Sequence, residues 1–89
     1  MMTPTIHANG TPAGALFEGY VEAANRTRAA LEAVAYTAPN GRDYYPQGQA
    51  AMEQAQVEHI ARLERLQALA EELEALALHC AQQKKEGGT

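Results

Sequence analysis

The segment from Met52 to Cys80 reads MEQAQVEHIARLERLQALAEELEALALHC, and it decides the fold of this chain. It holds no proline and no glycine, and its apolar residues recur at the spacing of a helix. They form one broad stripe of Met52, Ala55, Ile60, Leu63, Leu66, Leu69, Leu73, Leu76 and Cys80, flanked by Ala70 and Ala77. We therefore expect a helix over about residues 48–83, roughly 50 Å long at 1.5 Å per residue. Because apolar residues occupy more than one face, this helix needs more than one packing partner.

A shorter helix is expected before it, over about residues 12–38. Thr11 and Pro12 suit a helix start, since Thr can cap free amides and Pro is favoured at the first helical position. The apolar residues that follow alternate at spacings of three and four, which is a heptad pattern. They are Phe17, Tyr20, Ala24, Thr27, Leu31, Val34 and Ala38. Pro39, Asn40 and Gly41 then end the helix.

The connection at 39–47 is short, so the two helices must lie antiparallel. We expect an all-α protein, an antiparallel helical hairpin over 11–83 with a flexible leader at 1–10 and a disordered tail at 84–89. The start of the second helix stays open: Asp43 can cap it with Pro46 in its first turn, or it begins near Gly48.

Self-association is expected because the second helix is longer than the first and its leucine-rich end lacks a cover. A second copy completing a four-helix bundle, or a higher symmetric oligomer, provides that cover economically. The abundance of alanine points the same way, because alanine favours helix but buries little apolar surface. The expected oligomer core is Phe17, Tyr20, Leu31, Ile60, Leu63, Leu66, Leu73 and Leu76.

Composition excludes several classes of function. The 89 residues carry a net charge of −4, with 11 acidic against 7 basic residues, which disfavours direct DNA binding. A single cysteine, Cys80, cannot form a disulfide within the chain, which fits a reducing compartment. No apolar run is long enough for a membrane span or a signal peptide, so we expect no membrane partner and a cytoplasmic location.

Catalytic and metal-binding constellations are also not expected. The sequence has no serine, its single Cys80 lies near the end of a helix, and its acidic residues lie on solvated helical faces. His59 and His79 are separated by roughly 30 Å along one helix and His7 lies in the leader, so the three cannot share an ion. We expect no enzyme activity, no cofactor and no metal, and a partly buried His59 bonded to a neighbour.

The connection itself is rich in residues that recognise ligands. Tyr44 and Tyr45 offer flat faces with hydroxyl groups, and Arg42 offers a planar donor fork for carboxylate or phosphate. Together with Asp43 and Gln47 they form a candidate site for a planar anionic ligand or for a surface loop of a protein. The competing interpretation is that both tyrosines plug the open end of the hairpin.

The stretch Gly41-Arg42-Asp43-Tyr44-Tyr45-x-Gln47-Gly48, with Glu58-His59 and Glu72-Leu73-x-x-Leu76-Ala77-Leu78-His79, resembles small helical proteins of tailed phages and prophages of proteobacteria. The similarity covers about residues 31–79. It implies an accessory protein in the host cytoplasm that disables a host component or sequesters a nucleotide signal of host defence. It transfers no residue role.

Two functions follow as expectations. The first is an oligomeric, non-enzymatic binding module that engages a host protein or a small nucleotide-like anion through its loop. The alternative is a structural or assembly protein of a phage, in which the helices only build an oligomer and bind no ligand.

Overall fold

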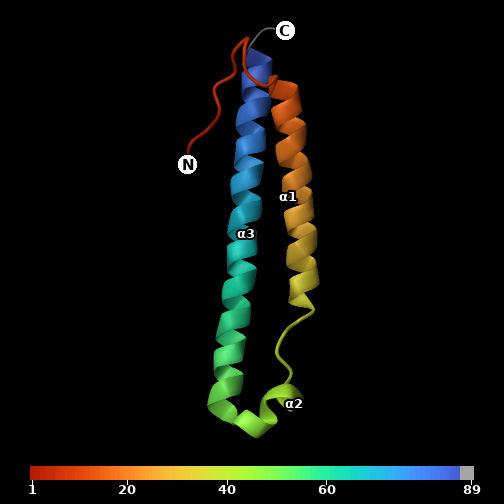
Figure 1. Cartoon of the computed structure of the whole chain (residues 1–89), viewed down its shortest axis with the longest axis vertical. Helices are drawn as coiled ribbons and strands as arrows, with labels where there is room; N and C mark the ends of the chain where they lie inside the picture. Colours follow the sequence, from red (N-terminus) through yellow and green to blue (C-terminus); the bar gives the residue numbers. More distant parts are fainter. Residues whose placement is uncertain (87–89) are drawn as a thin grey trace.

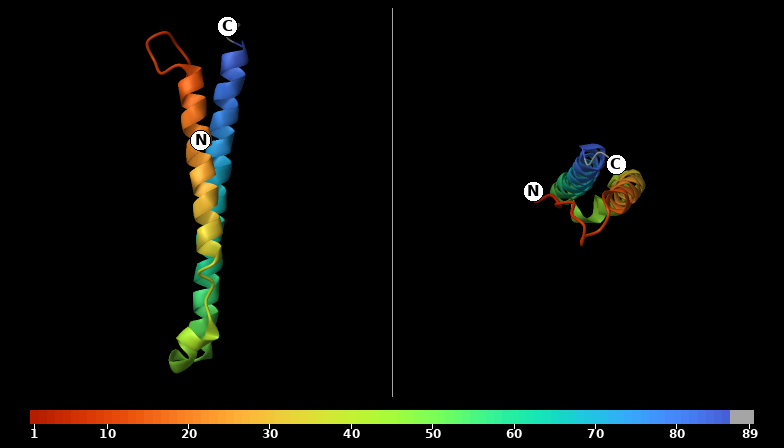
Figure 2. Two further views of the ribbon diagram at one scale, coloured as in Figure 1. Left: turned by 90° about the vertical axis from the view of Figure 1, so that its right-hand side faces the viewer. Right: turned by 90° about the horizontal axis from the view of Figure 1, so that it is seen from above.

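The computed structural model describes residues 1–86, and within that range every regular element is a helix. Helices α1 (Ala13–Ala35) and α3 (Gln49–Glu86) run antiparallel beside each other along the whole of α1 (Figure 1). Helix α2 (Gly41–Tyr44) and the 3₁₀ helix η1 (Tyr45–Gln47) connect them. The molecule measures 62 × 20 × 18 Å, a narrow rod in both further views (Figure 2). The expected all-helical hairpin is confirmed.

Helix α1 is shorter than expected at its C-terminal end. It stops at Ala35 because the amides of Tyr36 and Thr37 bond to carbonyls only three residues back, at 3.2 and 2.9 Å. The Thr37 hydroxyl also donates to the Val34 carbonyl at 2.7 Å. Ala38 therefore lies outside the helix and is exposed, so its assignment to the heptad pattern is wrong. At the other end Pro12 occupies the cap position without a side-chain cap, and Thr11 has no part in it.

The expected loop at 39–47 is mostly helical. Asn40, and not Asp43, provides the cap: its Oδ1 accepts the amide of Arg42 at 3.0 Å and starts α2. Helix α3 then begins at Gln49 and continues to Glu86, beyond the expected end at residue 83. Residues 84–86 of the expected tail thus belong to the helix, and residues 87–89 lie outside the described part of the chain.

The leader folds back over the end of the hairpin, toward α3 (Figures 1 and 2). Nε2 of His79 lies 3.0 Å from the Pro4 carbonyl, and Gly10 closes a turn onto the carbonyl of His7. Pro4 and Ile6 are half-buried. The leader therefore contacts the C-terminal part of α3.

The contact between α1 and α3 is a seam of small residues. Its buried members are Ala13 and Ala24 from α1, and His59, Ala70, Ala77 and Cys80 from α3. Ala55 is also buried, but it lies in the first turns of α3, which project past the end of α1. The larger apolar side chains flank this seam and are only half-buried, namely Phe17, Tyr20, Leu31, Leu63, Leu66, Leu73 and Leu76. Ile60 departs from the expectation, because His59 takes the seam position and leaves Ile60 54% exposed. Small seam residues bring the two helices close together but bury little apolar area.

His59 is buried in this seam with a polar atom left unsatisfied. Among the described residues its Nδ1 has no hydrogen-bond partner, contrary to the expectation of a bonded neighbour. A buried nitrogen without a partner costs free energy, so the seam is not optimised for the stability of the hairpin alone.

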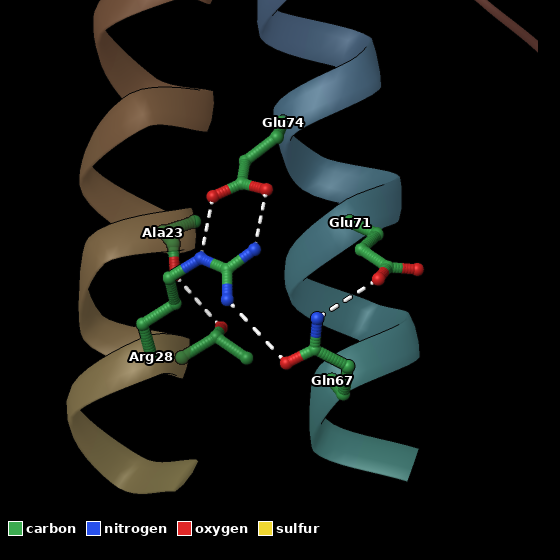
Figure 3. Close-up of polar contacts among 6 residues, drawn as sticks. Ala23, Arg28, Gln67, Glu71 and Glu74 are labelled. Atoms are coloured by element: carbon green, nitrogen blue, oxygen red, sulfur yellow. Dashed lines mark hydrogen bonds and ion pairs between the residues drawn. The ribbon is translucent and has the colours of Figure 1, made fainter. Parts of the chain in front are cut away.

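One side of the hairpin is crossed by a polar bridge centred on Arg28 (Figure 3). Its guanidinium donates to both carboxylate oxygens of Glu74, at 2.6 and 2.7 Å, and to Gln67 at 3.4 Å. Gln67 in turn donates to Glu71 at 2.8 Å. The hydrogen bond from Arg28 lowers the pKa of the Glu74 carboxyl and raises that of the guanidinium. The bridge fixes the level of α1 along α3.

Enlarging a seam residue should separate the helices. Ala70 is completely buried, so Ala70→Leu should lower the free energy of unfolding by about 1–3 kcal/mol through overpacking. Ala75 lies on the exposed side of the same helix, and Ala75→Leu should change it by less than about 0.5 kcal/mol. Urea denaturation followed by circular dichroism measures both. Equal losses in the two variants would show that the seam has been placed on the wrong face of α3.

Candidate functional site

The unequal helix lengths create a distinct end of the rod, here called the tip and comprising residues 41–58. Helix α1 ends at Ala35, so the first turns of α3 project past it and have no long helix beside them. Helices α2 and η1 fold against these turns instead (Figure 1). The tip is therefore built by short elements whose side chains do not serve the α1–α3 seam.

A hollow of about 300 Å³ lies between the connection and the start of α3. Its lining is Gly41, Tyr44, Tyr45, Gly48, Gln49 and Met52. Tyr44 is half-buried, whereas Tyr45 is 84% exposed. The interpretation of both tyrosines as a plug is therefore wrong for Tyr45. We call this feature the tyrosine hollow.

Tyr44 also borders a second hollow, of about 280 Å³, on another side of the tip. Its lining is Tyr44, Gln47, Ala51, Gln54, Ala55 and Glu58. The carboxylate of Glu58 makes this hollow less suited to an anion than the tyrosine hollow, whose lining contains no charged side chain. Tyr44 is the residue that the two linings share.

The local backbone explains why the tyrosines lie there. Pro46 falls in the first turn of η1, where its fixed φ suits a tight helix. Gly48 has φ +97° and ψ 172°, a conformation that side chains disfavour, and its amide bonds back to Tyr44 and Tyr45. This reversal turns the chain directly into α3 and holds both tyrosines against its first residues.

The electrostatic setting of the tyrosine hollow favours a negative group. The first amides of a helix lack intrahelical partners and carry partial positive charge, and the first turn of α3 contains no acidic residue. Arg42 and Asp43 are exposed on α2, and within residues 1–83 neither side chain forms an ion pair. Arg42 thus keeps its donors available to a ligand near the tip.

The structure brings together three of the five expected site residues. Tyr44 and Tyr45 line the tyrosine hollow, and Gln47 lines the second hollow. Arg42 and Asp43 lie on the same short element but line neither. Sequence reasoning missed Gln49 and Met52, which come from α3. Gly48 was the sequence feature that could have revealed Gln49 and Met52. The chain turns back at Gly48, so the helix that begins directly after it presents its first turn to the tyrosines.

A third hollow, of about 350 Å³, lies along the side of the hairpin that carries Arg28. Its lining is Leu31, Ile60, Leu63, Glu64, Gln67, Ala68 and Glu71. Three of these residues belong to the expected oligomer core. Two carboxylates border the hollow, so its opening is acidic and does not suit an anion.

The described part of the chain provides neither a metal site nor a membrane span. Over residues 1–83, no three His, Cys, Asp or Glu residues gather closely enough to hold a metal ion. No helix in that range combines the length and the apolar character that crossing a bilayer requires. The candidate site therefore rests on the tip alone.

Comparison with known protein families, curated proteins and solved structures yields no match. The similarity to phage and prophage proteins accordingly stays a prediction.

The geometry of the tip should depend on Gly48. Gly48→Ala places a side chain at positive φ and should lower the free energy of unfolding by about 1 kcal/mol or more. Gly41→Ala is the matched control: an added Cβ meets no atom there within 4 Å, and the backbone is helical, so it should be neutral or stabilising by up to about 1 kcal/mol. Thermal melts of both variants decide. Equal tolerance at the two glycines would contradict the described reversal.

Proposed function

We propose that this chain is a non-enzymatic binding module whose tip binds a small, planar, anionic ligand of the nucleotide type. The observation that carries the proposal is the tyrosine hollow. Two adjacent tyrosines border it, one of them 84% exposed, and it opens at the N-terminus of a 38-residue helix without acidic residues in its first turn. An aromatic surface beside partial positive charge matches a base attached to a phosphate.

Each part of such a ligand has a complementary group. The exposed ring of Tyr45 provides a stacking face, and Gln49 and the tyrosine hydroxyls provide polar contacts at its edge. The free amides of α3 and the guanidinium of Arg42 attract the anionic part. The volume of about 300 Å³ falls at the lower end of small-ligand sites, which supports a small ligand over the surface of a folded protein.

This site suggests sequestration and no chemical conversion. A ligand stacked on Tyr45 lies on an open surface where water is not excluded, and no His, Cys, Lys or acidic side chain lines the tyrosine hollow. Counter-defence by removal of a nucleotide signal from the host cytoplasm is the biological role that agrees best with the resemblance to phage and prophage proteins. Two other roles are possible outcomes of the experiment below: binding of a host protein, and a purely structural role. That experiment distinguishes both from nucleotide sequestration.

The chain offers a closely matched pair of tyrosines for the test. Tyr45 and Tyr36 are 84% and 85% exposed, but only Tyr45 borders the tyrosine hollow. In ¹H–¹⁵N spectra titrated with AMP, GMP, CMP and UMP separately, at least one nucleotide should shift the amides of residues 41–52. Tyr45→Ala should weaken that binding by about 5- to 150-fold, the usual cost of losing one stacking contact. Tyr36→Ala should leave it unchanged.

Both variants should retain the melting temperature of the wild type, because neither ring is buried. Native mass spectrometry of protein purified from cells complements the titration by reporting a retained ligand. Saturating nucleotide without any shift at the tip would overturn the proposal. If a host protein is retained instead, the protein partner is favoured; if nothing is retained, the structural role is favoured.

A further inference from the structure

We infer that a second copy of this chain docks on the side of the hairpin opposite Arg28, in a parallel pair that places both tips at the same end. The docking surface is here called the leucine face, which consists of Leu66, Leu69, Leu73 and Leu76 of α3 with Ala23, Thr27, Ala30 and Val34 of α1. The inference does not depend on what the tip binds.

The exposed area supports an additional partner. The chain exposes 6509 Å², whereas a compact monomer of 9.6 kDa exposes about 5,100 Å². The excess of about 1,400 Å² exceeds the roughly 800 Å² that each partner contributes to a standard stable interface. In addition, the buried apolar residues within 1–83 are only alanines and one cysteine, so every large apolar side chain in that range retains exposed surface for a partner.

The two sides of the hairpin differ in polarity, and this difference selects the face. The side of Arg28 is crossed midway by the hydrogen-bonded bridge to Glu74, Gln67 and Glu71 (Figure 3). A partner there would have to desolvate these charges. At 100° per residue, Leu69 and Leu76 point about 160° away from Gln67 and Glu74, toward the other side.

Between Leu66 and Leu76 the leucine face contains no charged residue, and Leu69 is 44% exposed there; Arg62, one heptad before Leu69, lies at the end of the face nearer the tip. The hydrogen bond between the leader and α3 is at His79, beyond the last leucine of this face. Arg65 and Glu72 follow along its outer edge. An apolar centre with charges at the edge is the usual composition of a protein interface.

The register of the hairpin indicates how two leucine faces fit together. Arg28 reaches both Gln67 and Glu74, so it lies level with the midpoint between them. Moving along the antiparallel helices, Ala30 lies near the level of Leu69, and Ala23 near that of Leu76. A two-fold axis parallel to the helices sets α3 opposite α1 of the second copy and brings each of these leucines against an alanine.

The alternative two-fold axis, perpendicular to the helices, sets leucine against leucine and alanine against alanine. That arrangement packs unevenly, because helix separation depends on the side chains at the contact. The parallel pair has large side chains opposite small ones along both contacts and yields an all-antiparallel four-helix bundle. It also presents two tyrosine hollows side by side, which would raise the avidity for a ligand with two recognisable halves.

Electron–electron distance measurements on a spin-labelled tip test this arrangement directly. A label is attached at Asp43→Cys, which is exposed on α2, in a Cys80→Ala background. Parallel packing predicts a label separation of roughly 20–40 Å, set by a few helix diameters of 10–12 Å. Because the chain is 62 Å long, antiparallel packing would give a separation of about 60 Å or more. The longer distance, or no dipolar signal at 100 µM protein, would overturn the inference.

Two substitutions identify the face. Leu69→Glu should convert a species of twice 9.6 kDa in light scattering into a single chain. Ile60→Glu changes a residue on the side of Arg28 that is 54% exposed, against 44% for Leu69, and should leave the pair intact. The reverse result would place the partner on the other side. If Leu69→Glu unfolds the chain, the spin-label distance still decides. Nucleotide shifts at the tip are recorded separately, so failure of the pair and failure of the tip are distinguishable.

Discussion

The small-residue seam between α1 and α3 is the constraint on which the rest of the structure depends. Alanines and one cysteine occupy its buried apolar positions, so the two helices approach closely along the length of α1. The same residues bury little area, because an alanine contributes only one methyl group. Leucines and aromatic residues therefore lie beside the seam, half-buried, on both sides of a narrow rod. The hairpin has a defined register but buries little apolar volume. The half-buried side chains beside the seam therefore keep apolar surface that a partner could cover.

The tip follows from a second constraint, the difference in length between the helices. Because α1 has 23 residues and α3 has 38, the connection must return along α3 rather than turn tightly between two helix ends. Three residues specify this return: Asn40 caps α2, Pro46 has a fixed φ, and Gly48 adopts a positive φ. The tyrosines are held at the start of α3 by this path. The proposed pairing surface and the proposed ligand site thereby lie in separate parts of one small chain.

The sequence predicted what depends on local periodicity. The heptad spacing from Phe17 to Val34 located the contacting face of α1, and the uninterrupted helical segment after Gly48 located α3. Features that depend on the phase between helices were not predictable. Ile60 fits the apolar stripe as well as its neighbours do, but His59 takes the seam position. The bridge from Arg28 to Glu74 joins helices whose register no local pattern specifies.

For the candidate site, the residue types in the connection were sufficient to locate the tip, but not to assign its lining. Arg42 and Asp43 precede the tyrosines in sequence yet line neither hollow, while Gln49 and Met52 were not considered because they lie in a helix. The helical turns of α2 and η1 account for both results. A loop that folds into short helices rotates each side chain by about 100° or more from the one before it, and only a three-dimensional path shows which sides they face.

Hydrogen exchange as a function of protein concentration tests most directly the claim that the seam alone leaves the hairpin incomplete. If a second copy completes the core, amide protection in residues 63–77 should rise as the chain concentration increases from nanomolar to micromolar, because association stabilises the folded state by mass action. In the tip, amide protection should rise only for those amides that exchange through global unfolding. Protection of residues 63–77 that is strong and independent of concentration would contradict the account, since the small-residue seam would then be sufficient for a stable monomer.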